Sequence, residues 1–327
     1  MPTTLLARSD RLDLPRLHYT CRVTSTDETS LSSEHFTDRV VAVLAATAVA
    51  PGFRPGAPST PRAGVDGGSS LQLFLMDGLL EALEWANDGV GSDEAACMWL
   101  AGLRWHRLAT GSFPDGAPEP RPRWIDDRLA PLASGGITPA DPQDLAGLAH
   151  DSMGTVGRPN DPSADGPGVL ARSAVAALLP RVTRATTAKF ATDAAALTHG
   201  SAAATSAAAE AALRVRRALE GDLGLPDGAD SVDARWGEGP AWGALRAAVS
   251  AARAAGTGTA DARAAFAAAV GPLAAEGRTA EAAFAGALVA AAHGTAALPD
   301  GWGDATPSAE TILEMAGRWR RLTFGEA

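Results

Sequence analysis

The sequence predicts an all-α protein, and three observations lead to that prediction. Alanine-rich segments carry apolar residues at helical spacing along much of the chain, and alanine has the highest helix propensity and lets helix axes approach closely. Runs in which β-branched apolar residues alternate with polar ones, as they do in strands, are scarce. Aromatic residues make up 5% of the 327 residues, with a single tyrosine. The expected core is therefore built from closely packed helices with small side chains.

The chain divides into an N-terminal extension and one helical domain. Residues 1–34 are polar and mixed, without sustained periodicity, and one short strand is expected around Leu17–Val23. Residues 35–327 are expected to form a single domain, a size that supports a large core. Its first buried helix is predicted to begin near Asp38 and to end before Pro51-Gly52.

The stretch 64–80 places a glycine-rich turn directly before an apolar helix. Ser69 or Ser70 is expected to cap this helix by accepting an orphan backbone N–H. Such a helix start, behind a loop with few side chains, can hold an anionic ligand, although it can equally be a simple capped helix. The acids of the helix lie on one stripe that is expected to face water, namely Asp77, Glu81, Glu84 and Asp88.

Further helices are predicted along the chain by the same spacing. They run from Ser92 toward Leu108, over 202–220, over 241–255, over 282–292 and after Thr306-Pro307. The last of them is expected to bury Ile312, Met315, Ala316 and Trp319. Segments 111–123 and 133–143 are predicted to be connections, with Asp126 and Asp127 as charges at a helix start.

Charge and cysteine content exclude several classes of partner. A net charge of −10 argues against nonspecific binding to nucleic acid or to anionic membranes, which favour a basic surface. The longest apolar stretch, Ala282–Ala292, is too short for a membrane span. Cys21 and Cys97 have no metal-binding spacing, and no secretion signal is apparent, so we expect a cytoplasmic, reduced protein.

Residues 157–172 form a second glycine-bearing loop that opens into a helix. Backbone N–H groups at such a place can cradle a phosphate, and the alternative is a simple turn before a helix. The candidate ligand-binding residues in this stretch are Asn160, Asp161, Gly166, Gly168 and Arg172.

Several segments together resemble the ADP-ribosylglycohydrolase family, in the right order over roughly residues 36–305. The segments are Leu-Phe-Leu-Met-Asp-Gly-Leu-Leu at 73–80, Gly-Pro-Gly at 166–168 with Arg172, Leu-Thr-His-Gly at 197–200, Gly-Pro-Ala-Trp at 239–242, and the helix 283–294 with Leu-Pro-Asp-Gly-Trp at 298–302. The resemblance implies a compact multi-helix orthogonal bundle of the ADP-ribosylglycohydrolase type. It also implies that the loop at 166–172 contacts the diphosphate and ribose of ADP-ribose.

The same resemblance adds two candidate ligand-binding side chains. His199 lies in the Leu-Thr-His-Gly segment, where a purely structural hydrogen-bonding role is the alternative. Trp242 can stack on adenine or belong to the core.

Members of this family are similar in using two Mg²⁺ or Mn²⁺ ions held by aspartates and threonines. In this chain Gly67 and Gly68 stand where the family has its first pair of aspartates, and Gly277 and Thr279 stand at the other two. Hard dications need several oxygen ligands, usually including carboxylates. We therefore expect no dinuclear metal centre and no cofactor.

The residues beside these positions suggest a different chemistry. Asp66 and Glu276 each precede a replaced aspartate by one residue, and together they could form a metal-free acid/base pair of the kind found in many glycosidases. Arg278 adds a cation that could face a phosphate or carboxylate. Gly67, Gly68 and Ser69 would contact the ligand. The alternative is that both acids are solvent-facing loop residues.

Three functions remain open at this level. The chain could be a divergent hydrolase that binds ADP-ribose or a related ribosyl nucleotide or nucleoside and cleaves its glycosidic bond without metals. It could be a catalytically inactive pseudoenzyme that acts as a nucleotide-binding or interaction module. Finally, the fold could serve an unrelated small molecule.

Overall fold

A computed structural model describes most of the domain and little of the N-terminal extension. The described residues are 32–56, 64–134, 136–138, 141–223, 237–258 and 261–325. The strand expected around Leu17–Val23 lies outside these residues, as does Cys21. Nothing in the structure therefore tests the division at residue 34.

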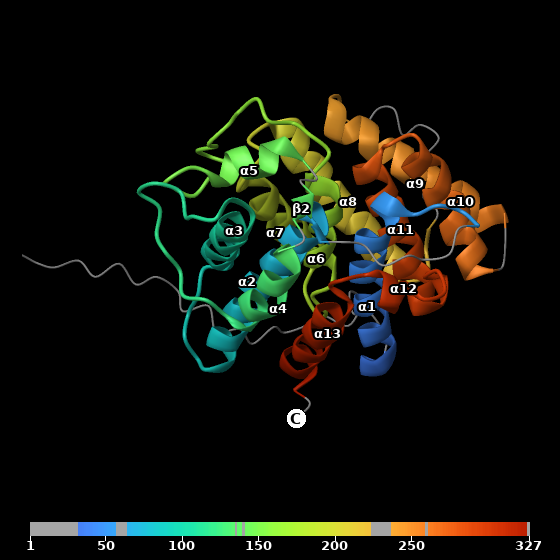
Figure 1. Cartoon of the computed structure of the whole chain (residues 1–327), viewed down its shortest axis with the longest axis horizontal. Coiled ribbons are helices and arrows are strands. Elements are labelled where there is room, and N and C mark those ends of the chain that lie inside the picture. The colour runs from blue at the N-terminus through green and yellow to red at the C-terminus, as the bar shows by residue number, and fades with distance from the viewer. Residues whose placement is uncertain are drawn as a thin grey trace, which may run out of the picture.

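The regular secondary structure of the described residues is almost entirely helical, which confirms the all-α prediction (Figure 1). One two-residue parallel pair, β1 (Val65–Asp66) with β2 (Ile137–Thr138), is the exception within the described ranges. The helices are α1 (Ser33–Val49), η1 (Ala50–Gly52), α2 (Gly67–Asn87), α3 (Glu94–Thr110), α4 (Trp124–Ala133), α5 (Pro142–Leu148), α6 (Val169–Ala177), α7 (Arg184–Ala196), α8 (Ala202–Leu219), α9 (Pro240–Gly258), α10 (Ala262–Ala275), α11 (Thr279–His293), η3 (Gly294–Ala297), α12 (Trp302–Ala305) and α13 (Ala309–Phe324).

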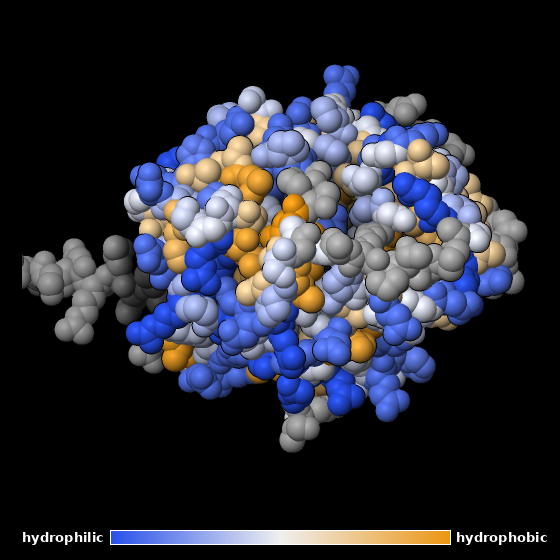
Figure 2. All heavy atoms as spheres, in the orientation of Figure 1, coloured by the Kyte–Doolittle hydropathy of each residue, from blue (hydrophilic) through white to orange (hydrophobic). Residues whose placement is uncertain are grey.

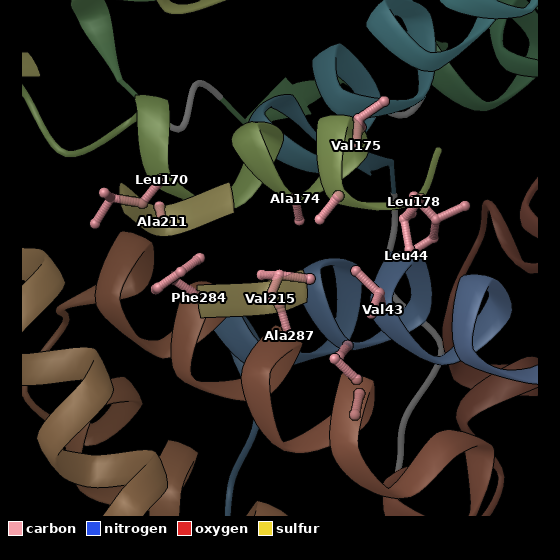
Figure 3. Packing of buried hydrophobic residues seen from close by; sticks show 14 of the residues in the cluster. Val43, Leu44, Leu170, Ala174, Val175, Leu178, Ala211, Val215, Phe284 and Ala287 are labelled. Atoms are coloured by element: carbon pink, nitrogen blue, oxygen red, sulfur yellow. The ribbon is translucent and has the colours of Figure 1, made fainter. Parts of the chain in front are cut away.

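Helix α11 lies at the centre of the bundle. It packs against α1, α8, α9 and α10, and every residue from Ala282 to Ala291 is buried. A helix that is apolar all round is stable only when other helices surround it, as here. Figure 3 shows side chains from α1, α6, α8 and α11 meeting in one layer, including Val43, Leu44, Leu170, Ala174, Ala211, Val215, Phe284 and Ala287.

Close helix contacts depend on small residues, as the composition predicts. A Cβ atom at Gly286 of α11 would lie 3.0 Å from the Phe266 ring of α10 and 3.4 Å from the Ala50 Cβ. Alanines fill most of the remaining interface positions of α8 and α11. The helix axes can therefore approach closely without large side chains between them.

Helix α2 begins earlier than predicted, and its cap is a different residue. Asp66 is the N-cap and accepts the backbone N–H of Ser69 at 2.8 Å, so the prediction of a cap at Ser69 or Ser70 is wrong. The Ser70 hydroxyl instead donates to the Gly67 carbonyl and accepts the indole N–H of Trp105. Because the helix already starts at Gly67, the residue that precedes it, Asp66, is the one in position to accept a free backbone N–H of the first turn.

The acidic stripe of α2 does not face water along its whole length, so the prediction fails for Asp77. Its side chain is fully buried, because α3 and α4 pack over this part of α2 and bring two arginines to it. Arg104 Nη2 lies 2.6 Å and Arg123 Nε 2.9 Å from Asp77 Oδ2. Asp126 is in the first turn of α4, as predicted, and it is also buried beside Arg104 at 2.6 Å.

The C-terminal helix α13 buries Ile312, Met315, Ala316 and Trp319, as predicted. Its N-cap is Ser308, so the helix begins just after the expected Thr306-Pro307 start.

The segment 133–143, predicted to be a connection, contains β2 and the start of α5, whose N-cap is Asp141.

The surface is mixed rather than uniformly polar. Figure 2 shows hydrophilic residues around the rim of one face and hydrophobic residues near its middle, at the place that β2 and α6 occupy in Figure 1. None of the helices in the described ranges is long and apolar enough to cross a membrane.

Candidate functional site

The first group of predicted site residues lies at the start of α2. Gly67 is buried and Ser69 is 5% exposed, while Asp66 is held by its capping hydrogen bond. A cavity of about 10 Å³ adjoins Asp66 and Ser69, and Thr306, Pro307 and Ser308 close its other side. This volume has room for about one water molecule.

The second group lies between α10 and α11, on the surface. Glu276 follows α10 as its C-cap and is exposed, with Oε2 3.5 Å from Arg278 Nη1. Arg278 Nε also lies 3.1 Å from Glu281 Oε1, so its guanidinium already faces two carboxylates. The contacts described for Asp66 and for Glu276 are with different neighbours, and they do not join the two acids. Within the described ranges, no three His, Cys, Asp or Glu side chains gather in a way that could hold a metal ion.

A buried polar cluster of five side chains underlies the second glycine-bearing loop. Its members are Asp141, Asp144, Arg172, Thr198 and His199, none more than 7% exposed. Arg172 of α6 donates to Asp144 of α5 and to the Thr198 hydroxyl, and its Nη2 lies 3.2 Å from His199 Nδ1. The cluster ties α5 and α6 to the turn before α8.

His199 has neighbours at both ring nitrogens. Nδ1 lies 2.7 Å from Thr198 Oγ1 and 3.2 Å from Arg172 Nη2. Nε2 lies 3.5 Å from Asp141 Oδ2 and has no hydrogen-bond partner within the described residues. His199 is fully buried and does not reach solvent. Its side chain faces Asp141, and Asp141 in turn contacts the loop.

Asp141 holds the glycine loop, which we define as residues 160–168. The backbone N–H of Gly168 donates to Asp141 Oδ2 at 3.1 Å, and that of Gln143 donates to Oδ1 at 2.9 Å. The N–H of Gly166 donates to Gln143 Oε1 at 2.7 Å. Burial raises the pKa of Asp141, but the neighbouring His199 and the hydrogen bonds from Gln143 and Gly168 outweigh it and bring the pKa to about 2. Asp141 is therefore ionised throughout the physiological range.

Both glycines are required by this arrangement. A Cβ atom at Gly166 would lie 2.4 Å from Asp141 Oδ2, and one at Gly168 would lie 2.7 Å from the Asp141 Cβ. Any larger residue would push the loop away from the carboxylate.

The remaining predicted loop residues are joined to the same unit. Asn160 Nδ2 donates to the carbonyls of Gly147 and Ser152. The Asp161 carbonyl accepts the N–H of Gly200 at 3.0 Å, next to His199. The structure thus brings together six residues that the sequence singled out: Asn160, Asp161, Gly166, Gly168, Arg172 and His199.

Sequence reasoning missed Asp141, Gln143, Asp144 and Thr198. One local signal was available, because an aspartate followed by proline marks the N-cap and first position of a helix. Nothing in the local sequence indicates that the same carboxylate reaches Gly168.

Trp242 packs within the fold. Its ring is 6% exposed, its Nε1 donates to Ser206 Oγ at 3.1 Å, and it leaves no room for a side chain at Gly237. The neighbouring N–H of Ala241 donates to the Asp165 carbonyl, which anchors α9 to the glycine loop. Stacking of Trp242 on a ligand would require it to leave these contacts.

Comparisons with known proteins agree with this architecture. A family model described as ADP-ribosylglycohydrolase matches residues 35–326. Among solved structures, one described as an ADP-ribosylglycohydrolase-related protein complex is similar with a TM-score of 0.54 and 20% identity, covering 89% of this chain and 99% of that one. At this identity the likeness supports the fold alone. No curated protein matches the sequence.

Proposed function

The chain belongs to the ADP-ribosylglycohydrolase family, and from that premise we propose that it binds ADP-ribose or a related ribosyl nucleotide or nucleoside. The ligand would contact the start of α2 at Gly67, Gly68 and Ser69, and the glycine loop. The observation that carries this proposal is the connected unit of Asn160, Asp161, Gly166, Gly168, Arg172 and His199. A glycohydrolase-like function follows from the family, and the ligand and the chemistry are our proposals.

The residues present do not fit the family's pair of metal ions. The start of α2 offers the single carboxylate of Asp66, which is already a helix cap, followed by Gly67 and Gly68. At the start of α11, the carboxylate of Glu281 is already paired with the cation of Arg278. A dinuclear site needs several anionic oxygens to offset the dehydration of the ions. No step of the proposed chemistry passes through a metal.

We propose that cleavage, where it occurs, uses Asp66 and Glu276 as the catalytic acids. Hydrolysis of a glycosidic bond by paired carboxylates needs one group to activate water and one to protonate the leaving group. Asp66 adjoins the water-sized cavity at the start of α2, which suits it to activate the water. Glu276 would have to leave its ion pair with Arg278 and take up a proton from solvent, and it would then donate that proton to the leaving group.

The second candidate is a catalytically inactive binding module. It is favoured by the exposed position of Glu276 and by its ion pair with Arg278, since neither places it beside Asp66. In this case the start of α2 and the glycine loop bind the nucleotide and no bond is cleaved.

Release of ADP-ribose from an ADP-ribosylated peptide, measured with and without EDTA, tests the two candidates. The variant Asp66→Asn keeps an N-cap of comparable strength, so it tests the carboxylate without removing the cap. Glu276→Gln tests the second acid, and Asp300→Asn, at an exposed ion pair with Arg263, is the control. Release that is insensitive to EDTA and falls at least about a hundredfold in both test variants supports the hydrolase.

Two other results would change the assignment. Tight binding of ADP-ribose without release supports the binding module. Release that disappears with EDTA and returns with manganese overturns the metal-free chemistry.

A further inference from the structure

A groove lined mainly by apolar side chains lies between the second half of α2, the start of α7 and the end of α13. Its volume is about 250 Å³, whereas a single water molecule needs only about 10–15 Å³. The groove therefore has room for several side chains. We call it the apolar groove, and the apolar residues that line it include Leu79, Leu83, Leu179, Val182, Phe190 and Leu322.

The apolar groove is separate from the proposed ligand site at the start of α2. Leu79 comes twelve residues after Gly67 in the same helix, which is about 18 Å along the helix axis. An occupant of the groove therefore binds at a different surface, and its binding does not depend on the proposed function.

The first described residues of the chain lie beside one end of this groove. Ser32 is the N-cap of α1, and the ring of Phe36 lies 5.6 Å from the ring of Phe324, measured between ring centres. The guanidinium of Arg181 lies 5.2 Å from the centre of the same Phe324 ring, and Arg181 lines the groove. Helix α13, which carries Phe324, packs against α1 (Figure 1). The N-terminal extension therefore joins the domain next to the apolar groove.

The extension contains one segment whose pattern suits an apolar surface. Over 17–23, apolar residues occupy every second position, namely Leu17, Tyr19, Cys21 and Val23. In an extended chain, residues at this spacing share one face. The eight residues from 24 to 31 can span up to about 25–30 Å. That length exceeds the two side-chain contacts that separate Phe36 from the groove, so the segment can reach it.

Charge favours the same pairing. Residues 16–23 include Arg16 and Arg22 and no acidic residue, while the whole chain has a net charge of −10. Glu94 lies among the residues that line the groove. Arg181, which also lines it, has its guanidinium over the Phe324 ring. An arginine of the segment can therefore meet Glu94 at the rim while the apolar face enters the groove.

From these observations we propose that the segment Leu17–Val23 binds in the apolar groove of its own chain, with its apolar face toward α2 and α13. The driving force is the removal of apolar surface from water on both sides of the contact. Because residues 24–31 tether the segment, binding is intramolecular and takes place at a high effective concentration. The groove is thus a docking surface for the N-terminal extension.

Disulfide trapping with the native Cys21 tests the proposal in the full chain. In a Cys97→Ser background, Leu83→Cys places a thiol in the groove, and Leu313→Cys places one at an exposed position of α13 that is not part of its lining. Under mild oxidation, the intrachain disulfide with Cys21 is expected to form at least about tenfold faster in the groove variant, because docking raises the local concentration of Cys21 there. Mass spectrometry of tryptic peptides identifies the bond.

Two results of this experiment would overturn the proposal. Equal rates in the two variants would show that the extension meets both positions by chance and does not dock. Disulfide-linked dimers as the main product would show that the groove takes the extension of a second copy. Circular dichroism checks the fold of each variant, and Leu322→Cys replaces Leu83→Cys if the latter does not fold.

Tyr19 allows a second measurement, because it is the single tyrosine of the chain. Biosynthetic incorporation of 3-fluorotyrosine therefore gives one fluorine resonance, which reports on residue 19. We expect this resonance to differ from that of a peptide covering residues 10–30 and to move to the position of the peptide in Leu83→Asp. Leu313→Asp, the matched control, should leave it in place. A wild-type resonance at the position of the peptide would contradict docking.

Discussion

Arg104 Nη2 lies 2.6 Å from Asp77 Oδ2, and neither side chain is more than 1% exposed. The same guanidinium reaches Asp126 of α4 at 2.6 Å, and the indole of Trp124 donates to the other oxygen of Asp77 at 2.8 Å. One arginine of α3 therefore pairs with two buried carboxylates from α2 and α4, and Arg123 and Arg107 each add a second cation beside one of them. Helices α2, α3 and α4 are joined by this network.

Removal of the arginine should destabilise the protein strongly. In Arg104→Ala, the buried carboxylates of Asp77 and Asp126 lose their shared counterion, and we expect the free energy of unfolding to fall by about 3–5 kcal/mol. The control is Arg128→Ala, because Arg128 is half exposed in its pair with Glu314 and its loss should cost less than about 1 kcal/mol. Urea denaturation followed by circular dichroism measures both. Equal losses in the two variants would contradict the role assigned to Arg104.

The contact between α5 and the turn before α8 should tolerate no side chain at Gly147. A Cβ atom there would lie 2.3 Å from the Thr198 Cα. Gly147→Ala is therefore expected to lower the free energy of unfolding by about 1–3 kcal/mol or more. Gly243→Ala is the matched control, since its Cβ would meet nothing within 4 Å and it lies in α9, where alanine is favoured by up to about 1 kcal/mol. Thermal unfolding should show opposite shifts, and a loss in both would refute the explanation.

Asp141 should make stability depend on acid pH. Its pKa is about 2 in the folded protein, below the ordinary value of 3.8, so the unfolded chain takes up this proton more readily. The stabilisation is fully present above about pH 5 and is lost as the pH falls toward 2, and it amounts to about 2 kcal/mol. Urea midpoints measured over this range should fall more steeply for the wild-type protein than for Asp141→Asn. Parallel curves would show that the ionisation of Asp141 does not make the stability depend on pH.

Cys97 should react slowly with thiol reagents at neutral pH. Burial raises the pKa of its thiol to about 11, and Glu81, Asp93 and Glu94 add to the effect. Since the thiolate is the reactive form, labelling of the Cys21→Ser variant at pH 8 should be about a hundredfold slower when folded than when denatured. Labelling with iodoacetamide followed by mass spectrometry provides the rates. A folded rate close to the denatured one would contradict the assigned environment.

The sequence alone determined most helix positions. Apolar spacing and alanine content are local properties, so the helices at α1, α3, α8, α9, α11 and α13 were found within a few residues of their ends. It also identified the glycine loop, Arg172 and His199 as candidates. The start of α2 was predicted wrongly. Ser69 or Ser70 was expected to accept the free N–H groups of its first turn, and the nearby Asp66 accepts one of them instead.

Only the tertiary structure decided what these residues contact. Asp77 belongs to a stripe that its own helix would leave in water, and it is buried because α3 and α4 lie over it. Asp141 resembles an ordinary helix cap until the fold brings the amide of Gly168 to its second oxygen. Helix periodicity depends on neighbours within one or two turns, whereas burial and charge pairing depend on segments far apart in the chain. For that reason the sequence could propose an anion cradle at the glycine loop, and only the fold could show that the N–H of Gly168 already donates to the carboxylate of Asp141.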